Sequence, residues 1–218
     1  MSGGDQMRIG IDIDDTLTDI KDQLTNKAIE YAKSLGKNTD IKKEIHDIYN
    51  NGNIYQQLFG FSYDELKYFL GPLQEEITNQ ALPRKNCVQI IKKLHEEGHE
   101  IYIITARDCE FHEDPYLQSK TWLDKNDIYY DKLIVNARDK RTVCLGQHID
   151  LLIDDSISNC ERVCDGGIDA IMIGKEDGEI NHIPVFHDWQ QIYEYIHKKR
   201  QWLSDMHCLF IFILFLRL

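Results

Sequence analysis

Positive charge is scarce in this chain. Its 25 Lys and Arg residues are outnumbered by 37 Asp and Glu residues, which gives a formal net charge of −12. Nucleic acids and anionic membranes bind basic surfaces, so we expect neither a nucleic acid polymer nor a membrane as a partner. A small phosphorylated substrate remains compatible with this charge, because a metal ion can reverse the sign of the local field.

The paired cysteine spacing of a zinc site is also missing. Cys160 and Cys164 lie four residues apart, and the other cysteines form no matching second pair. We therefore expect free thiols in a reducing compartment, the cytoplasm. The residues before Met7 are small and polar, and we expect no signal peptide.

No apolar run is long enough for a membrane-spanning helix. The longest is Leu209 to Leu216, whereas a spanning helix needs about 20 residues. Residues 201–218 are therefore expected to be an apolar tail of uncertain role, either docked on the protein or not native to it.

Apolar runs alternate with helical patterns along the rest of the chain. The runs that predict buried strands are Met7–Ile13, Ile101–Thr105, Lys132–Val135, Leu151–Asp154 and Ala170–Ile173. Helical spacing predicts helices over 84–97 and 117–125 and after Asp188. Strands alternating with helices predict an α/β fold in which helices cover both faces of a parallel sheet.

A helical module interrupts this alternation after the first strand. Leu24 to Leu35 repeats apolar residues at helical spacing, and Ile41 to Tyr49 does the same. Ser62 and Glu65 form a capping box that opens another helix, and Gly71-Pro72 is expected to end it. Inserted helices at the carboxyl edge of a sheet often act as lids.

The first predicted strand ends in a cluster of acids, Asp12-Ile13-Asp14-Asp15-Thr16. At about 4 Å and an effective dielectric near 20, each like-charged pair costs roughly 4 kcal/mol. Such a cluster needs a cation or a function that uses its field. Acids two residues apart suit Mg²⁺-assisted phosphoryl transfer through a carboxylate nucleophile.

Other polar groups follow the next three strands. The second strand ends at Thr105-Ala106-Arg107, Lys140 follows the third, and the fourth ends at Asp154-Asp155. Ligands in α/β sheets bind outside the carboxyl ends of the strands, so these groups are expected to meet. Each residue alone has an ordinary explanation as a turn, cap or surface residue, but their combination favours a site.

The chemistry assigns each group a role. Asp12 is the candidate nucleophile, and Asp14 the acid that protonates the leaving oxygen and later deprotonates water. Arg107 either contacts substrate phosphate or braces its loop. The groups expected to bind the phosphoryl oxygens are Thr105, Ala106, Arg107 and Lys140. The groups expected to hold Mg²⁺ are Asp12, Asp14, Asp154 and Asp155, with Asp14 able to use its backbone carbonyl and Asp155 acting through water.

These motifs resemble the haloacid dehalogenase-like phosphohydrolase superfamily. Asp12-Ile-Asp14-Asp-Thr16 matches its DxDxT motif, Ile103-Ile-Thr105 its second, Lys140 its third and Ile153-Asp154-Asp155 its fourth. Within the superfamily, segments such as Ile104-Thr-Ala-Arg107 and Thr121-Trp-Leu123 are similar to the 5′(3′)-deoxyribonucleotidase-like group. The resemblance implies a Rossmann-like core (7–18 and 83–200), with the first strand between those ending at Thr105 and Asp154, and a helical cap (19–82).

The expected function is a Mg²⁺-dependent phosphatase, a nucleotidase acting on nucleoside monophosphates through an aspartyl-phosphate. A phosphatase for sugars or other small metabolites, or a phosphomutase, stays open, as does a homodimer. A dehalogenase is disfavoured because that branch lacks the second aspartate, here Asp14. A phospho-acceptor signalling domain is the alternative outside enzymes, but there the acid pair precedes the lysine, whereas Lys140 precedes Asp154-Asp155.

Overall fold

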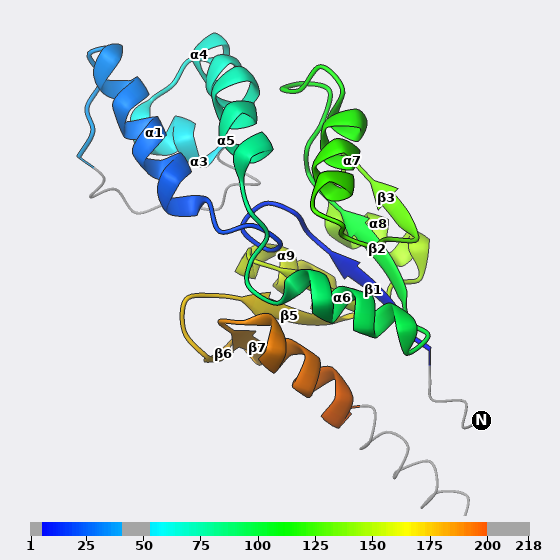
Figure 1. Ribbon diagram of the computed structural model, residues 1–218. Coiled ribbons are helices and arrows are strands. Elements are labelled where there is room, and N and C mark those ends of the chain that lie inside the picture. The colour runs from blue at the N-terminus through cyan, green and yellow to red at the C-terminus, as the bar shows by residue number, and fades with distance from the viewer. Residues whose placement is uncertain (1–5, 41–52, 200–218) are drawn as a thin grey trace, which may run out of the picture.

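A seven-stranded sheet lies at the centre of the computed structural model, which describes residues 6–40 and 53–199 (Figure 1). The strands are β1 (Arg8–Ile11), β2 (Glu100–Ile104), β3 (Lys132–Ile134), β4 (Leu151–Asp154), β5 (Asp169–Ile173), β6 (Gly178–Ile180) and β7 (Ile183–Phe186). They are ordered β3-β2-β1-β4-β5-β7-β6, and all neighbours are parallel except β6 and β7. The predicted α/β fold and the place of β1 between β2 and β4 are confirmed.

The last two strands were not predicted from the sequence. β6 is fully exposed, and β7 contains Pro184, which removes a ladder donor and argues against a strand. β7 nevertheless pairs with β5, joining Met172 to Val185, while β6 adds an antiparallel edge. Pairing between chain-distant segments therefore overrides the weak local signal.

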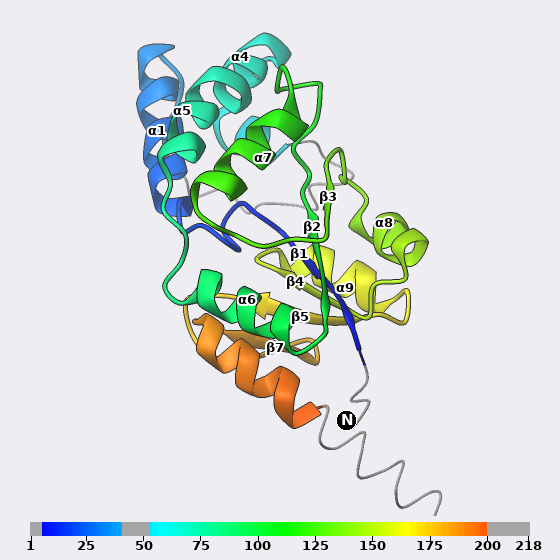
Figure 2. The same cartoon turned by 45° about the vertical axis from the view of Figure 1, so that its right-hand side comes forward.

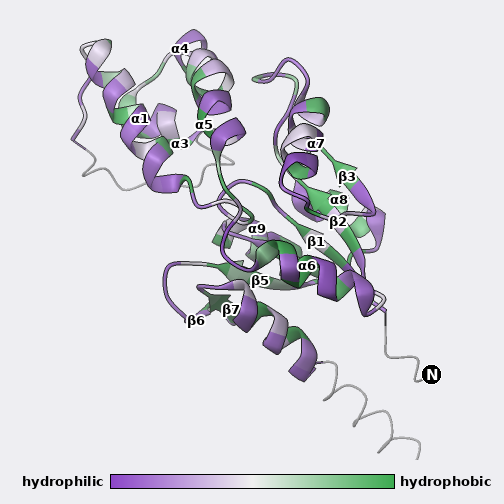
Figure 3. Ribbon diagram, viewed as in Figure 1, coloured by the Kyte–Doolittle hydropathy of each residue, from purple (hydrophilic) through white to green (hydrophobic). Residues whose placement is uncertain are grey.

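Helices cover both faces of the sheet, as expected (Figure 2). One face carries α6 (Cys87–Glu96), α7 (Pro115–Lys125) and a helix over 189–199, which pack on Ile9, Ile11 and Ile153. The other carries α8 (Lys140–Gln147) and α9 (Ile157–Cys164), which pack on Ile104 and Leu152. Hydrophobic residues concentrate on the strands and recur as stripes on helices that are otherwise hydrophilic (Figure 3).

Among the described residues, four further helices, called the cap helices below, lie over the carboxyl end of the sheet (Figure 1). They are α1 (Lys21–Ser34), α3 (Ile54–Phe59), α4 (Tyr63–Tyr68) and α5 (Gln74–Gln80). Their buried core consists of Ala28, Ala32, Phe59, Phe61, Leu66, Phe69 and Leu70. The predicted capping box is present, since Ser62 Oγ accepts from the Glu65 amide and Glu65 Oε2 accepts from the Ser62 amide. The second predicted helix of this module, Ile41 to Tyr49, lies outside the described residues, as does the apolar tail.

The expected helix end at Gly71-Pro72 is confirmed, because the backbone leaves helical geometry at Gly71. The segment Phe69–Leu73, which contains this break, joins α4 to α5 as two helices that meet at a kink. Gly71 takes φ −85° and ψ −105°, and this kink absorbs the ring and the missing N–H of Pro72. A Cβ on Gly71 would lie 2.7 Å from the carbonyl oxygen of Phe111, so the kink also allows a close approach to the loop after β2.

Arg84 joins the two segments that connect the cap helices to the sheet domain. Its amide donates to the Leu17 carbonyl at 2.6 Å. Its side chain donates to the carbonyl oxygens of Thr18 at 2.8 Å and Asp15 at 2.9 Å. Thr18 also forms an isolated bridge with Pro83, so the two segments are tied together directly below the cap helices.

We expect Arg84→Met to lower the free energy of unfolding by about 1.5–3 kcal/mol, because carbonyl acceptors lose a charged donor. Urea denaturation followed by circular dichroism measures the change. Lys85→Met, at the exposed neighbouring position, is the matched control and should have little effect. Equal stability of the two variants would show that the side-chain hydrogen bonds of Arg84 contribute nothing to the free energy of unfolding.

Within the described residues, no helix has both the length and the apolar character required to cross a membrane.

Candidate active site

The carboxyl ends of β1, β2 and β4 place three of the predicted residues at one edge of the sheet. Asp12 follows β1, and its amide donates to Ile153 of β4 at 3.1 Å. Asp154 is the last residue of β4, and Thr105 follows β2 with its amide donating to Ile134 of β3 at 2.9 Å. Because these neighbouring strands are parallel, the backbone pairing itself brings the groups together.

Lys140 lies between two of these carboxylates. It is the first residue of α8, a helix capped by Asp139, and only 3% of it is exposed. Its Nζ lies 2.6 Å from Asp12 Oδ1 and 2.5 Å from Asp154 Oδ2. Burial disfavours the charged lysine, but the two carboxylates outweigh burial and raise the pKa of Lys140. The side chain is therefore a fixed positive charge beside the candidate nucleophile.

Three carboxylates form a cluster that could hold a metal ion. Asp12, Asp154 and Asp155 each offer an oxygen within 4.8 Å of the others. Burial and the adjacent acids raise the pKa of Asp12 despite Lys140, and burial and Asp154 raise the pKa of Asp155 to about 7. The three carboxylates, when ionised, thus carry more negative charge than the single positive charge of Lys140 can offset. An oxygen-only, buried and over-charged donor set fits a hard divalent cation.

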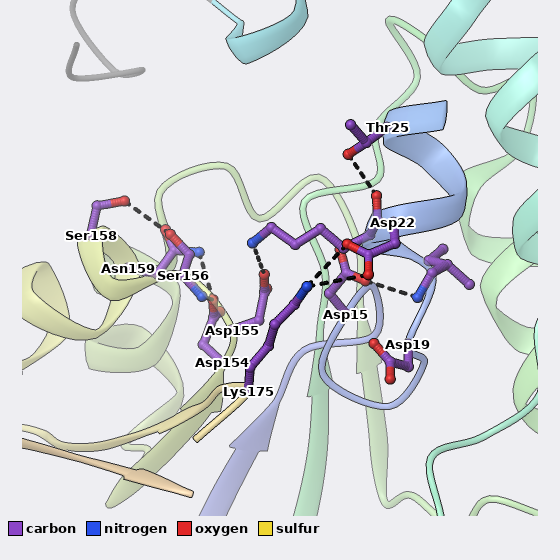
Figure 4. Close-up of polar contacts among 12 residues, drawn as sticks. Asp15, Asp19, Asp22, Thr25, Asp154, Asp155, Ser156, Ser158, Asn159 and Lys175 are labelled. Atoms are coloured by element: carbon purple, nitrogen blue, oxygen red, sulfur yellow. Dashed lines mark hydrogen bonds and ion pairs between the residues drawn. The ribbon is translucent and has the colours of Figure 1, made fainter. Parts of the chain in front are cut away.

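Neighbouring polar groups hold two members of the cluster, Asp154 and Asp155, in place (Figure 4). Asp154 Oδ1 accepts from the Ser156 amide at 2.9 Å and from Asn159 Nδ2 at 3.0 Å. Lys21, at the start of α1, lies 3.6 Å from Asp155 Oδ2. The side-chain amide of Asn159 therefore orients the Asp154 carboxylate.

The Asp14 carboxylate is not part of this cluster. Arg107 Nε donates to Asp14 Oδ2 at 2.8 Å, and Arg107 Nη2 donates to Asp14 Oδ1 at 2.7 Å. Burial disfavours the Asp14 carboxylate, but Arg107 outweighs burial and holds the pKa of Asp14 below its ordinary value. The side chain of Asp14 therefore faces Arg107, and its backbone carbonyl is the group left for the predicted metal contact.

The remaining predicted phosphate ligands lie on the loop after β2. Thr105 is buried, and its Oγ1 accepts from the Arg107 amide at 3.3 Å. Ala106 is exposed. Both line the same cavity as Asp12 and Asp14, so all the predicted site residues except Asp154 reach this space, and Asp154 lies behind Lys140.

The cavity, of about 680 Å³, separates Asp12 and Asp14 from the cap helices. The part of its wall contributed by described residues of the cap is uncharged: Leu24, Asn53, Ile54, Tyr55, Gln56, Tyr63, Leu66, Leu70 and Gln74. Tyr55 also packs edge-on against Phe69, with ring centroids 4.6 Å apart. The rings of Phe59, Phe61 and Phe69 thus belong to the buried core of the cap helices, while Tyr55 and Tyr63 border the cavity.

Among the side chains that line this cavity, those of His112 and Arg138 were not predicted from the sequence. His112 lines the cavity while only 8% exposed, and burial and Arg107 lower its pKa. Arg138 also lines the cavity and pairs with Asp108 and Glu110. A single histidine or arginine without a spaced partner carries no signal in the sequence, so neither could have been found from it.

The sequence of this chain is similar to those of known proteins. Residues 6–202 match the family model for the 5′ nucleotidase, deoxy (Pyrimidine), cytosolic type C protein. A Bacillus cereus protein named "Putative nucleotidase" is 27% identical over 202 residues, covering 88% of this chain and 100% of the relative.

The fold is shared with solved structures of low identity. A haloacid dehalogenase-like family hydrolase from Streptococcus pneumoniae gives a TM-score of 0.54 at 15% identity, covering 88% of this chain and 98% of that chain. A HAD hydrolase from Entamoeba histolytica gives 0.59 at 14% identity, covering 85% and 95%. The chain shares its fold with haloacid dehalogenase-like hydrolases, it belongs to the family of the 5′ nucleotidase, deoxy (Pyrimidine), cytosolic type C protein, and it is a phosphoric monoester hydrolase.

Proposed function

We propose that this protein is a Mg²⁺-dependent phosphatase that hydrolyses nucleoside monophosphates through an aspartyl-phosphate on Asp12. The observation that carries this proposal is the shared cavity, in which Asp12 and Asp14 face an uncharged cap wall. The contact of Lys140 with Asp12 supports the same reading, because it places a permanent cation beside the reacting carboxylate.

The chain's own residues account for both half-reactions. In the first, Asp14 acts in its protonated form, which is the minor one because Arg107 favours the ionised carboxylate. A carboxylate oxygen of Asp12 bonds to phosphorus, the ester P–O bond breaks, and Asp14 gives its proton to the departing alkoxide. In the second, Asp14 takes a proton from water, the hydroxide oxygen bonds to phosphorus, and the P–O bond to Asp12 breaks. Inorganic phosphate leaves, and both side chains return to their starting states. Lys140, Thr105 and the adjacent amides stabilise the phosphoryl oxygens throughout.

Asp12, Asp154 and Asp155, with the backbone carbonyl of Asp14, would hold the Mg²⁺. When bound, the ion supplies positive charge that offsets the phosphoryl oxygens and the crowded carboxylates.

The cap wall favours a neutral group on the far side of the phosphate. Among the described residues that line the cavity, the cap helices contribute side-chain amides and rings but no cation. Amides can hydrogen-bond to the edges of a nucleobase, and rings can stack on it. A mutase that handles a bisphosphate would need a cation for the second phosphate. The wall therefore favours a nucleoside monophosphate over a bisphosphate, and a neutral sugar phosphate is the alternative.

A phosphate-release screen tests this substrate class. We expect kcat/KM for nucleoside monophosphates to exceed that for sugar bisphosphates by about 10²-fold or more, because the unpaired second phosphate would remain desolvated in an acidic cavity. Ribose and deoxyribose forms should both be included. Preference for a sugar phosphate would reject the nucleotide assignment while leaving the phosphatase chemistry intact.

Removal of the metal is expected to stop turnover reversibly. Dialysis against EDTA should reduce phosphate release to background, and Mg²⁺ should restore it, because the over-charged cluster lacks its counter-ion. The ion should also raise the melting temperature of the metal-free protein, since it binds only the folded state. Full activity in excess chelator would contradict the proposed Mg²⁺ site.

A further inference from the structure

The guanidinium of Arg107 is committed to Asp14. Two of its nitrogens donate to the two Asp14 oxygens at 2.8 and 2.7 Å, and Nη1 lies 3.5 Å from Ser119 Oγ on α7. Its side chain is only 2% exposed. This differs from Arg138, the other arginine of the cavity, whose side chain is 54% exposed.

The backbone on both sides of this pair is anchored. The Arg107 amide donates to Thr105 Oγ1 at 3.3 Å, and the Arg107 carbonyl accepts from the Asn136 amide at 2.8 Å. Arg107 is thus fixed to the ends of β2 and β3, whereas Asp14 belongs to the loop after β1, 93 residues earlier in the chain. The pair therefore connects the loop after β1 to a segment that is hydrogen-bonded at the carboxyl ends of β2 and β3.

A two-point contact of this kind orients a carboxylate as well as binding it. The two donors fix both oxygens of Asp14 relative to the guanidinium, which a single donor could not achieve. Each oxygen keeps a further lone pair for the proton that Asp14 transfers. The contact also keeps the Asp14 carboxylate on the Arg107 side and out of the cluster formed by Asp12, Asp154 and Asp155.

We propose that Arg107 is a positioning residue, which aims the carboxylate of Asp14 at the leaving oxygen and does not itself bind the substrate phosphate. This inference rests on the proposed function, because it assigns Asp14 the proton transfer to the leaving group. If this is correct, replacing Arg107 should slow only those reactions in which Asp14 transfers a proton.

The leaving group separates the two roles of Arg107. A nucleoside alkoxide needs a proton as it departs, whereas 4-nitrophenolate is stable without one. With enzyme in excess, release of the leaving group reports the first half-reaction alone. For Arg107→Gln we expect this rate to fall about 10²-fold with a nucleoside monophosphate, the lower range of general acid catalysis, and less than about 5-fold with 4-nitrophenyl phosphate. An equal loss on both substrates, with weaker inhibition by inorganic phosphate, would overturn the proposal in favour of phosphate binding.

A double-mutant cycle with Asp14→Asn keeps the test valid if Arg107→Gln folds poorly. The single variant leaves a buried carboxylate unpaired, but the Arg107→Gln/Asp14→Asn variant leaves none. If Arg107 acts through Asp14, the double variant should match Asp14→Asn in leaving-group release and in inhibition by inorganic phosphate. A further loss of more than about 5-fold in the double variant would reject the inference, since coupled residues do not add.

Arg107→Lys is the conservative variant. One ammonium can contact Asp14 but cannot bind both oxygens in plane, so it should restore stability better than it restores the rate with a nucleoside monophosphate. Restoration of both to the same degree would mean that charge alone matters and would reject the positioning role. Failure of the proposed function is distinguishable, because the wild-type protein would then release no phosphate from nucleoside monophosphates.

Discussion

Asp12→Asn is expected to lower turnover by about 10⁴-fold or more, since the reaction loses its nucleophile. The amide is nearly the same size as the carboxylate, and only 6% of Asp12 is exposed, so the packing should be preserved. Lys140 keeps Asp154 as a partner at 2.5 Å, which should hold it in place. Phosphate release under saturating Mg²⁺ measures the loss, and thermal unfolding checks the fold.

Asp127→Asn is the matched control for this substitution. Asp127 is exposed, lies after α7 away from the cavity, and has φ +55°, a conformation that asparagine also tolerates. It should leave turnover unchanged. More than a few per cent of residual activity in Asp12→Asn would show that the nucleophile has been assigned to the wrong residue.

Lys140→Met is expected to lower both stability and turnover. Methionine fills a similar volume without charge, leaving Asp12 and Asp154 buried with no cation between them. Breaking a buried ion pair in this way costs about 3–5 kcal/mol, and the free energy of unfolding in urea should fall by that amount. Turnover should fall by about 10²-fold or more, because the phosphoryl oxygens lose a fixed positive charge.

Mg²⁺ provides a second readout for the same variant. Since the ion would offset part of the repulsion between Asp12 and Asp154, it should stabilise Lys140→Met more than it stabilises the wild type. Lys132→Met, at an exposed position of β3, is the control and should show neither effect. A Lys140→Met protein as stable as the wild type in the absence of metal would disprove the electrostatic account of the cluster.

Much of the fold follows from local pattern. β1 and β4 are continuous apolar runs, and α6 has apolar residues at helical spacing. These local patterns predict a strand or a helix without tertiary information. β7 could not be predicted in this way, because Pro184 opposes a strand locally and only pairing with β5 forms it. The helix break at Gly71-Pro72 was predicted from these two breaker residues, but the close approach of Gly71 to the Phe111 carbonyl could not be, because only tertiary packing brings them together.

The sequence by itself determined which chemical groups gather at the site. Asp12, Thr105 and Asp154 each end a strand, and parallel strands bring their carboxyl ends to one edge whatever the rest of the chain does. Only the tertiary structure decided which group each one faces. The partner of Asp14 is Arg107, 93 residues away, and its geometry depends on loops whose positions are set by packing. The uncharged cap wall was likewise settled by how the cap helices lie over the sheet, because no local pattern records which side of a short helix will border a cavity.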